Sequence, residues 1–133
     1  MNHNTLSPYL RRVLLADALV CLACGLLLTL GAALLADLLA LPATLLRALG
    51  IFLLPYGAVV AWIATRAAPP RWTIWAVVIA NTIWMVDSFV LLASGWIAPN
   101  ALGIAFLIAQ AVLVAGFALA QTIGLRQRTP ALA

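Results

Sequence analysis

The sequence contains no lysine and no glutamate, and its charged residues are seven arginines and three aspartates. Charged residues make up only 8% of the 133 positions, whereas 67% are hydrophobic and the mean hydropathy is +1.19. A soluble domain is about half apolar and about a quarter charged. A chain this short with so few polar side chains cannot cover an apolar core against water. The composition therefore predicts an integral membrane protein whose main solvent is lipid.

The scarcity of chemically active side chains excludes most catalytic and cofactor sites. The single histidine, His3, lies in the polar leader, which excludes a haem held by histidines within the membrane. No group of histidine, cysteine and carboxylate has metal-site spacing. The sequence also has no glycine-rich phosphate loop and no serine–histidine pairing. We therefore expect no enzyme activity and no cofactor.

The two cysteines, Cys21 and Cys24, form a CxxC motif inside an apolar run. On a helix they share a face with Asp17, which raises the alternatives of a redox centre, an ion path or a polar seam between helices. A redox centre of this type needs a second cysteine pair, and the sequence has none. The thiols are therefore interpreted as small, buried residues that pack between helices.

Four apolar runs are long enough to cross a bilayer, since a spanning helix needs roughly 20 apolar residues. They are 13–36, 45–65, 72–94 and 101–123. Each connection is short and contains a proline, which stops a helix and turns the chain. The sequence therefore predicts an all-α fold: one transmembrane domain over 1–133, an up-down-up-down four-helix bundle with tails 1–12 and 124–133.

The arginines predict the orientation of this bundle. Six of them fall on one side of the four-span arrangement, and only Arg47 falls on the other. Because basic residues concentrate in cytoplasmic loops, both termini are expected in the cytoplasm, an N-in/C-in topology. The basic charge thus reflects membrane topology, so lipid is the expected partner and nucleic acid is not.

One polar residue near the middle of each span predicts a shared interior seam: Cys24, Tyr56, Asn81 and Gln110. The candidate site residues are Asp17, Tyr56, Asn81, Asp87 and Gln110. Asp17 lies roughly 6 Å inside the cytoplasmic edge at a rise of 1.5 Å per residue. Its carboxylate either couples to a proton or cation, or has a structural partner. The structural alternatives are Arg66, Arg71, Trp62 and Gln121.

Asp87 is the strongest functional candidate, because it lies deeper in the outer half of its helix. Two readings stay open: a structural ion pair with Arg47, or a transport or ligand site. Pro55 interrupts the second span beside Tyr56, where it either shapes a cavity or forms a passive kink.

The last span presents two faces. Gly103, Gln110, Phe117 and Gln121 form one stripe, which suffices for the bundle. The other is a face of small residues, the kind through which helices associate in lipid. It comprises Ala105, Ala109, Gly116, Ala120 and Gly124. This face is the candidate contact for a homo-oligomer or a larger membrane complex, unless it turns inward against the bundle.

Three segments, LRRVLLADALV, RALGIFLLPYGAVVAWIATRAAPPR and SGWIAPNALGIAFLIAQA, resemble small four-helix inner-membrane proteins of bacteria. The resemblance implies a bacterial inner (plasma) membrane location and no specific activity. In length and helix count the chain also looks like small multidrug resistance transporters. It departs from their pattern because it lacks a glutamate in the first helix and a tyrosine or tryptophan in the fourth.

Two functions are therefore expected as alternatives. The first is a non-catalytic packing or accessory protein that associates with itself or with a larger complex. The second is a small oligomeric carrier or channel for a proton-coupled or a hydrophobic, cationic solute. Water access to Asp87 distinguishes them, because a carrier needs this carboxylate to face a cavity and a packing protein needs it bonded and dry.

Overall fold

The computed structural model describes residues 5–128, and every regular element in that range is helical. The helices are α1 Pro8–Leu30, α2 Ala32–Leu39, α3 Ala43–Thr65, α4 Arg71–Ser94 and α5 Ala101–Arg128. Among the described residues, α1, α3, α4 and α5 are long and apolar enough to cross a membrane. The expected all-α bundle of four spanning helices is confirmed, and the chain is a multi-pass membrane protein.

The first span differs most from the expected range 13–36. Helix α1 begins earlier because the Ser7 hydroxyl accepts a hydrogen bond from the Leu10 N–H at 3.1 Å, and Pro8 stands in the first turn. The helix then breaks at Gly31, and the short helix α2 continues to Leu39. At the other end of the chain, α5 runs beyond the expected residue 123 to Arg128.

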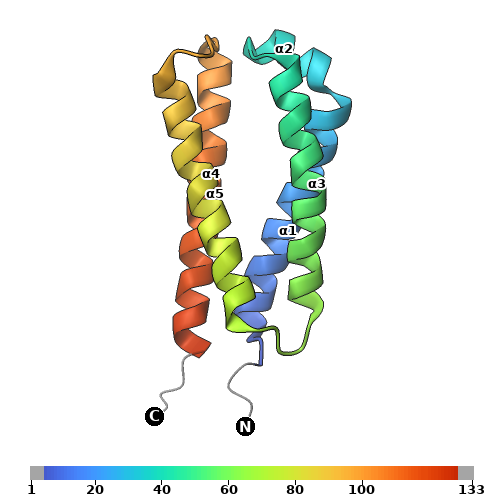
Figure 1. Cartoon of the computed structure of the whole chain (residues 1–133), viewed down its shortest axis with the longest axis vertical. Coiled ribbons are helices and arrows are strands. Elements are labelled where there is room, and N and C mark those ends of the chain that lie inside the picture. Colours follow the sequence, from blue (N-terminus) through green and yellow to red (C-terminus); the bar gives the residue numbers. More distant parts are fainter. Residues whose placement is uncertain (1–4, 129–133) are drawn as a thin grey trace.

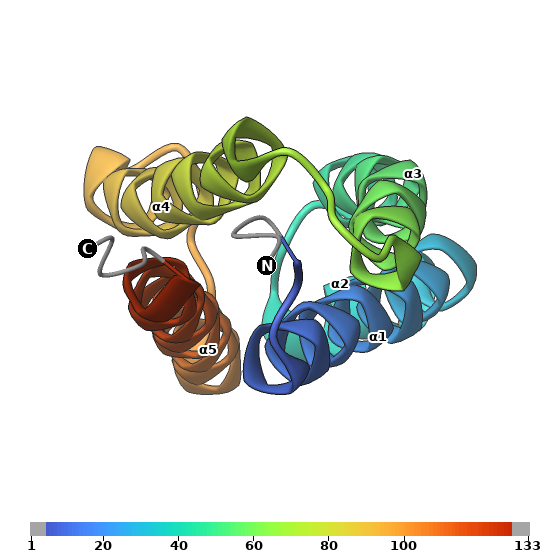
Figure 2. The same ribbon diagram turned by 90° about the horizontal axis from the view of Figure 1, so that it is seen from below.

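The four spanning helices form two closely packed antiparallel pairs, α1 with α3 and α4 with α5. Viewed along the bundle, the helices follow one another in a ring in the order α1, α3, α4, α5 (Figure 2). Helix α1 also packs against α5, whereas α3 and α4 scarcely touch although they are neighbours in sequence. The two pairs lie close together at the end that holds both chain termini and diverge toward α2 (Figure 1).

Hydrogen bonds from side chains to backbone carbonyls hold the two ends of the bundle. At the end near the termini, the arginine-rich end, the Arg11 guanidinium donates to the Ala64 carbonyl and Arg71 donates to the Leu125 carbonyl at 3.2 Å. At the opposite end, the α2 end, the Asn100 side chain donates to the Leu38 carbonyl at 2.9 Å. These bonds satisfy carbonyls that a helix C-terminus leaves open, and they join α1 to α3, α4 to α5 and α2 to the start of α5.

The outer surface of the bundle is apolar, as a lipid environment requires. Leucine side chains such as Leu19 and Leu30 are largely exposed. Exposed tryptophans lie toward both ends, with Trp62 and Trp72 toward the arginine-rich end and Trp96 near the α2 end. Tryptophan is enriched at this depth because its ring is apolar and its N–H is polar.

Glycines allow α1 and α3 to pack with their backbones in contact. A Cβ atom placed on Gly50 lies 2.7 Å from the Thr29 nitrogen and 2.8 Å from the Gly25 carbonyl oxygen. In lipid, where apolar surfaces gain nothing by meeting, such close approach is a main source of helix association. The α1–α3 pair therefore depends on the absence of side chains at this crossing.

We predict that Gly50→Leu destabilises the folded monomer, while Gly116→Leu does not. Gly116 is the matched control because, apart from its own helix backbone, no atom of the described residues lies within 4 Å of a Cβ placed there. Forcing a side chain into packed backbone costs on the order of 1–3 kcal/mol, and more where backbone atoms must move. Unfolding in mixed detergent micelles with increasing SDS measures the difference. Equal stability of the two variants would contradict the close α1–α3 crossing.

Candidate functional site

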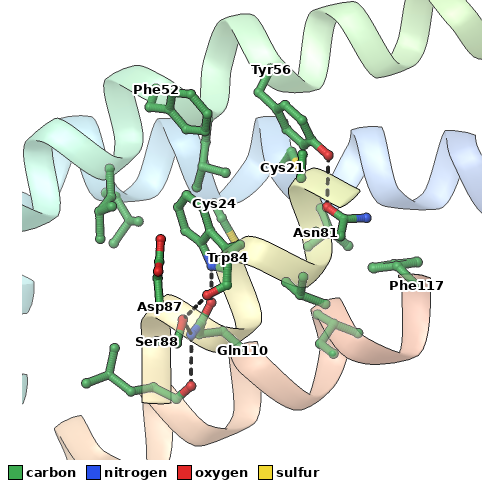
Figure 3. A pocket seen from close by; sticks show the side chains of 18 of the residues that line it. Cys21, Cys24, Phe52, Tyr56, Asn81, Trp84, Asp87, Ser88, Gln110 and Phe117 are labelled. Carbon is green, nitrogen blue, oxygen red and sulfur yellow. Dashed lines mark hydrogen bonds between the residues drawn. The ribbon is translucent and has the colours of Figure 1, made fainter. Parts of the chain in front are cut away.

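A cavity of about 470 Å³ lies between the four spanning helices. Its wall is mostly apolar, and residues from α1, α3, α4 and α5 contribute to it (Figure 3). The polar side chains on the wall are Asp17, Cys21, Cys24, Tyr56, Asn81, Trp84, Asp87, Ser88 and Gln110. No described residue that lines the cavity is basic. The cavity is therefore an apolar chamber with acidic and neutral polar groups.

Four polar side chains, one from each spanning helix, form a hydrogen-bonded group that we call the Asp17 cluster: the buried Asp17, Asn81 and Gln121 and the half-buried Tyr56. The Asp17 Oδ2 atom accepts from Gln121 Nε2 at 2.7 Å and from Asn81 Nδ2 at 2.9 Å. Asn81 Nδ2 also lies 3.2 Å from Gln121 Oε1. The Tyr56 hydroxyl donates to Asn81 Oδ1 at 2.9 Å. The cluster joins all four spanning helices at one level.

The Asp17 carboxylate is only 2% exposed, and neutral groups surround it. Besides the two amides, the Cys21 thiol donates to its Oδ1 atom at 3.5 Å. Of the structural partners expected from the sequence, Gln121 bonds to Asp17, whereas Trp62 is exposed and lies beneath the Arg66 guanidinium at 4.8 Å. A buried carboxylate is stabilised by donors aimed at its oxygens. The amides of Asn81 and Gln121 meet this requirement.

A second polar group, the Gln110 cluster, joins α4 to α5 closer to the α2 end. It comprises Trp84, Ser88 and Gln110. The Trp84 indole N–H donates to Gln110 Oε1 at 2.6 Å, and Gln110 Nε2 donates to the Ser88 hydroxyl at 2.8 Å. These bonds fix the indole ring of Trp84 against the cavity (Figure 3).

Asp87 differs from the members of both clusters because nothing in the described chain bonds to it. Its side chain is exposed, lines the cavity and lies beside Trp84 (Figure 3). The expected partner Arg47 is exposed near the start of α3, and no ion pair within residues 5–128 joins it to Asp87. The pair is absent because α3 and α4 have diverged at this end of the bundle. Asp87 thus faces the cavity, as a ligand site requires.

The single seam expected from the sequence is divided in the structure. Asp17, Tyr56 and Asn81 meet, but the glutamine that joins them from α5 is Gln121 and not Gln110. Gln110 lies about three turns before Gln121 in α5, closer to the α2 end, and forms its own cluster. Trp84 and Ser88 were not among the candidates. Their spacing of three and seven residues after Asn81, which places them along one side of α4, was the available signal.

The face of small residues on α5 is also divided. Ala105, Ala109 and Gly116 are exposed, whereas Gly124 is buried against Leu10 of α1. The carbonyl of Ala120 accepts a hydrogen bond from the Tyr9 hydroxyl at 3.1 Å. The expected continuous outer face therefore exists only over the half of α5 nearer the α2 end. The other half is used within the bundle, because α1 and α5 converge at the arginine-rich end.

The structure also places the two cysteines and Pro55. Both thiols are free, with Cys21 bonded to Asp17 and Cys24 on the cavity wall. Helix α3 continues through Pro55, and Tyr56 lines the cavity that was one of the two expected consequences of this proline.

No family model, no curated protein and no solved structure matches this chain. Its class is therefore defined by its own fold and site: a small four-span membrane protein with a cavity between its helices.

We predict that Asn81→Leu destabilises the fold by about 1–3 kcal/mol, the usual cost of leaving a buried polar group without its partner. The change removes a donor to Asp17 and the acceptor of Tyr56. Thr82→Leu is the control, since Thr82 is exposed and bonds only to its own helix among the described residues. Unfolding in mixed micelles measures both. A loss of stability no greater than that of the control would show that the Asp17 cluster does not hold the bundle.

Proposed function

We propose that this protein is a small membrane carrier that binds a hydrophobic cation in the cavity between its four helices. The carboxylate of Asp87 carries the proposal. It lines an apolar cavity, no group in the described chain bonds to it, and no basic side chain shares the wall. A positively charged ligand supplies the missing counter-charge.

The energetic cost of Asp87 supports a functional role. A charged side chain at the centre of a spanning helix costs about 2.5–3.5 kcal/mol on insertion scales, and less toward either interface. Such a residue is therefore usually paired or faces a water-filled or ligand-binding space. The first alternative is not met within residues 5–128, which leaves the second.

The size and character of the cavity suit an organic ligand. Ligand sites commonly enclose roughly 300–1,000 Å³, are mostly apolar and contain a few polar groups that fix orientation. The cavity of about 470 Å³ falls in this range. Asp17 lines the same cavity and adds a second negative charge, which its amide partners hold in place. The negative field of two carboxylates favours a cation over an anion or a neutral solute.

The proposal includes a location and a non-catalytic role. Arg11, Arg66 and Arg71 lie at the same end of the bundle as both termini of the described chain, and Arg47 lies at the other. We therefore propose a bacterial inner membrane with the arginine-rich end in the cytoplasm. We propose no catalysis, because the Asp17 oxygens already accept hydrogen bonds from three side chains.

Association with a second copy or with a larger complex is a second candidate function. It is supported by the exposed half of the small-residue face, at Ala105, Ala109 and Gly116. A Cβ atom placed on Gly116 meets nothing, so a partner helix has space to approach the backbone there. An oligomer of carriers is compatible with this function.

We predict that Asp87→Asn weakens binding of tetraphenylphosphonium by about tenfold or more, which corresponds to roughly 1.4 kcal/mol. The matched control is Asp37→Asn, which removes the same charge from an exposed position on α2 outside the cavity. Calorimetric titration of the purified protein in a nonionic detergent measures both. Unchanged binding in Asp87→Asn would remove this carboxylate from the site. No saturable binding by the unaltered protein would contradict the proposed function.

We also predict that Gly116→Leu disrupts any oligomer while the monomer stays folded, because the added side chain points into open space on the isolated chain. Cross-linking in native membranes measures the oligomer, and thermal unfolding in detergent measures the monomer. A wild-type protein that is strictly monomeric in its membrane would refute association with itself.

A further inference from the structure

The side of the bundle between α3 and α4 is its most loosely packed side. The other neighbouring helices pack backbone against backbone or are joined at their ends, whereas α3 and α4 scarcely touch. Side chains make the described links across this side: the Tyr56 hydroxyl bonds to Asn81 at 2.9 Å, and the Phe52 ring stacks on the Trp84 ring with centroids 6.0 Å apart. We call the region closed by these side chains the α3–α4 opening.

When the protein is in a membrane, the α3–α4 opening faces the surrounding lipid. Phe52 is 53% exposed on the outside of the bundle, yet it also lines the cavity. A second apolar hollow of about 370 Å³ runs along the same side toward the arginine-rich end, and Tyr56 and Ala80 line both hollows. The α3–α4 side is therefore recessed along much of its length. A hydrocarbon chain in this recess stays in an apolar environment.

The side chains at the α3–α4 opening suit an ammonium head group. Phe52 stacks on Trp84 and also on Tyr56, with that second pair of centroids 5.9 Å apart. The bond to Gln110 holds the Trp84 ring, whereas ring contacts alone hold Phe52 among the described residues. A cation within about 6 Å of an aromatic face is attracted by the ring, most strongly by tryptophan. Asp87, one turn along α4 from Trp84, supplies a full negative charge on the same wall.

We propose that the α3–α4 opening is the path by which a single-chain quaternary ammonium amphiphile enters from the bilayer. Its head group lies between Trp84, Phe52 and Asp87, and its hydrocarbon tail stays in the opening against lipid. A quaternary nitrogen has no N–H to satisfy, so a site of rings and one carboxylate is complete for it. Movement of the half-exposed Phe52 ring admits the head group. This inference rests on the proposed function and adds the ligand class and the route.

The test uses Trp84 as a reporter of contact with lipid. Replacing Trp62, Trp72, Trp75 and Trp96 by phenylalanine leaves Trp84 as the only tryptophan, and all four replaced side chains are exposed. The protein is placed in phosphatidylcholine vesicles whose acyl chains carry bromine, which quenches tryptophan on contact. We expect quenching of Trp84, stronger quenching after Phe52→Ala, and saturable relief on adding dodecyltrimethylammonium. Phe89→Ala is the control, since Phe89 is exposed on α4 outside the cavity.

Two results would overturn the inference. Trp84 that is quenched by aqueous iodide but not by brominated lipid would show that the opening does not face the bilayer. The second result uses an uncharged isostere of dodecyltrimethylammonium, in which carbon replaces the quaternary nitrogen. If this isostere relieves the quenching of Trp84 equally well, the head-group charge is not recognised. If either result occurs while tetraphenylphosphonium still binds in detergent, the route or the ligand class fails and the proposed function stands.

A binding measurement in the full tryptophan background keeps the test decisive if the single-tryptophan variant does not fold. We expect Phe52→Ala to weaken dodecyltrimethylammonium binding about fivefold, the change that roughly 1 kcal/mol of lost cation–π attraction produces. Phe89→Ala should leave binding unchanged. Equal affinities of these two variants would remove Phe52 from the head-group site.

Discussion

The hydrogen bonds of the Asp17 carboxylate are the interaction on which the rest of the bundle depends. In lipid, apolar side chains gain nothing by leaving their solvent, so close backbone contacts and polar bonds must hold helices together. The carboxylate of α1 accepts from Asn81 of α4 and Gln121 of α5, and Asn81 accepts from Tyr56 of α3. Each partner helix therefore has its rotation fixed at this level. The cluster turns two helix pairs into one bundle.

The open side of the molecule follows from where these constraints act. Glycines bring α1 and α3 into backbone contact, and arginines join helix ends at the arginine-rich end. Beyond the Asp17 cluster, toward the α2 end, no hydrogen bond joins α3 to α4 in the described chain. The pairs diverge there, and the cavity occupies the space between them. A cavity inside so small a bundle thus results from placing the polar bond between α3 and α4 toward the arginine-rich end.

The two carboxylates of the cavity have different surroundings and therefore different proposed roles. Asp17 is buried and its oxygens are occupied by neutral donors, so it contributes structure and a fixed negative field. Asp87 is exposed to the cavity and bonds to nothing in the described chain. A ligand that binds Asp87 does not have to break the bonds that hold the bundle. This separation lets the proposed binding site change without loss of the fold.

The sequence by itself determined the properties that depend on local pattern and on the solvent. Four apolar runs separated by prolines are sufficient for four spanning helices, because lipid requires every backbone group to be bonded within the helix. Asp17, Tyr56 and Asn81 were all named as intramembrane polar candidates, but counting from residue 13 placed Asp17 nearer the cytoplasmic edge than the other two. Asp17 reaches their level because α1 begins earlier, at Pro8. Depth follows from counting residues at a fixed rise.

Only the tertiary structure decided which way each helix turns and where neighbours separate. Gln121 and not Gln110 completes the Asp17 cluster, and Asp87 has no contact with Arg47. Both outcomes depend on helix rotation and tilt. The apolar side chains of a span do not fix its rotation or tilt, because lipid solvates any apolar face of a helix equally well. Backbone crossings such as Gly25 with Gly50 fix them instead, and the sequence does not reveal which glycines will meet.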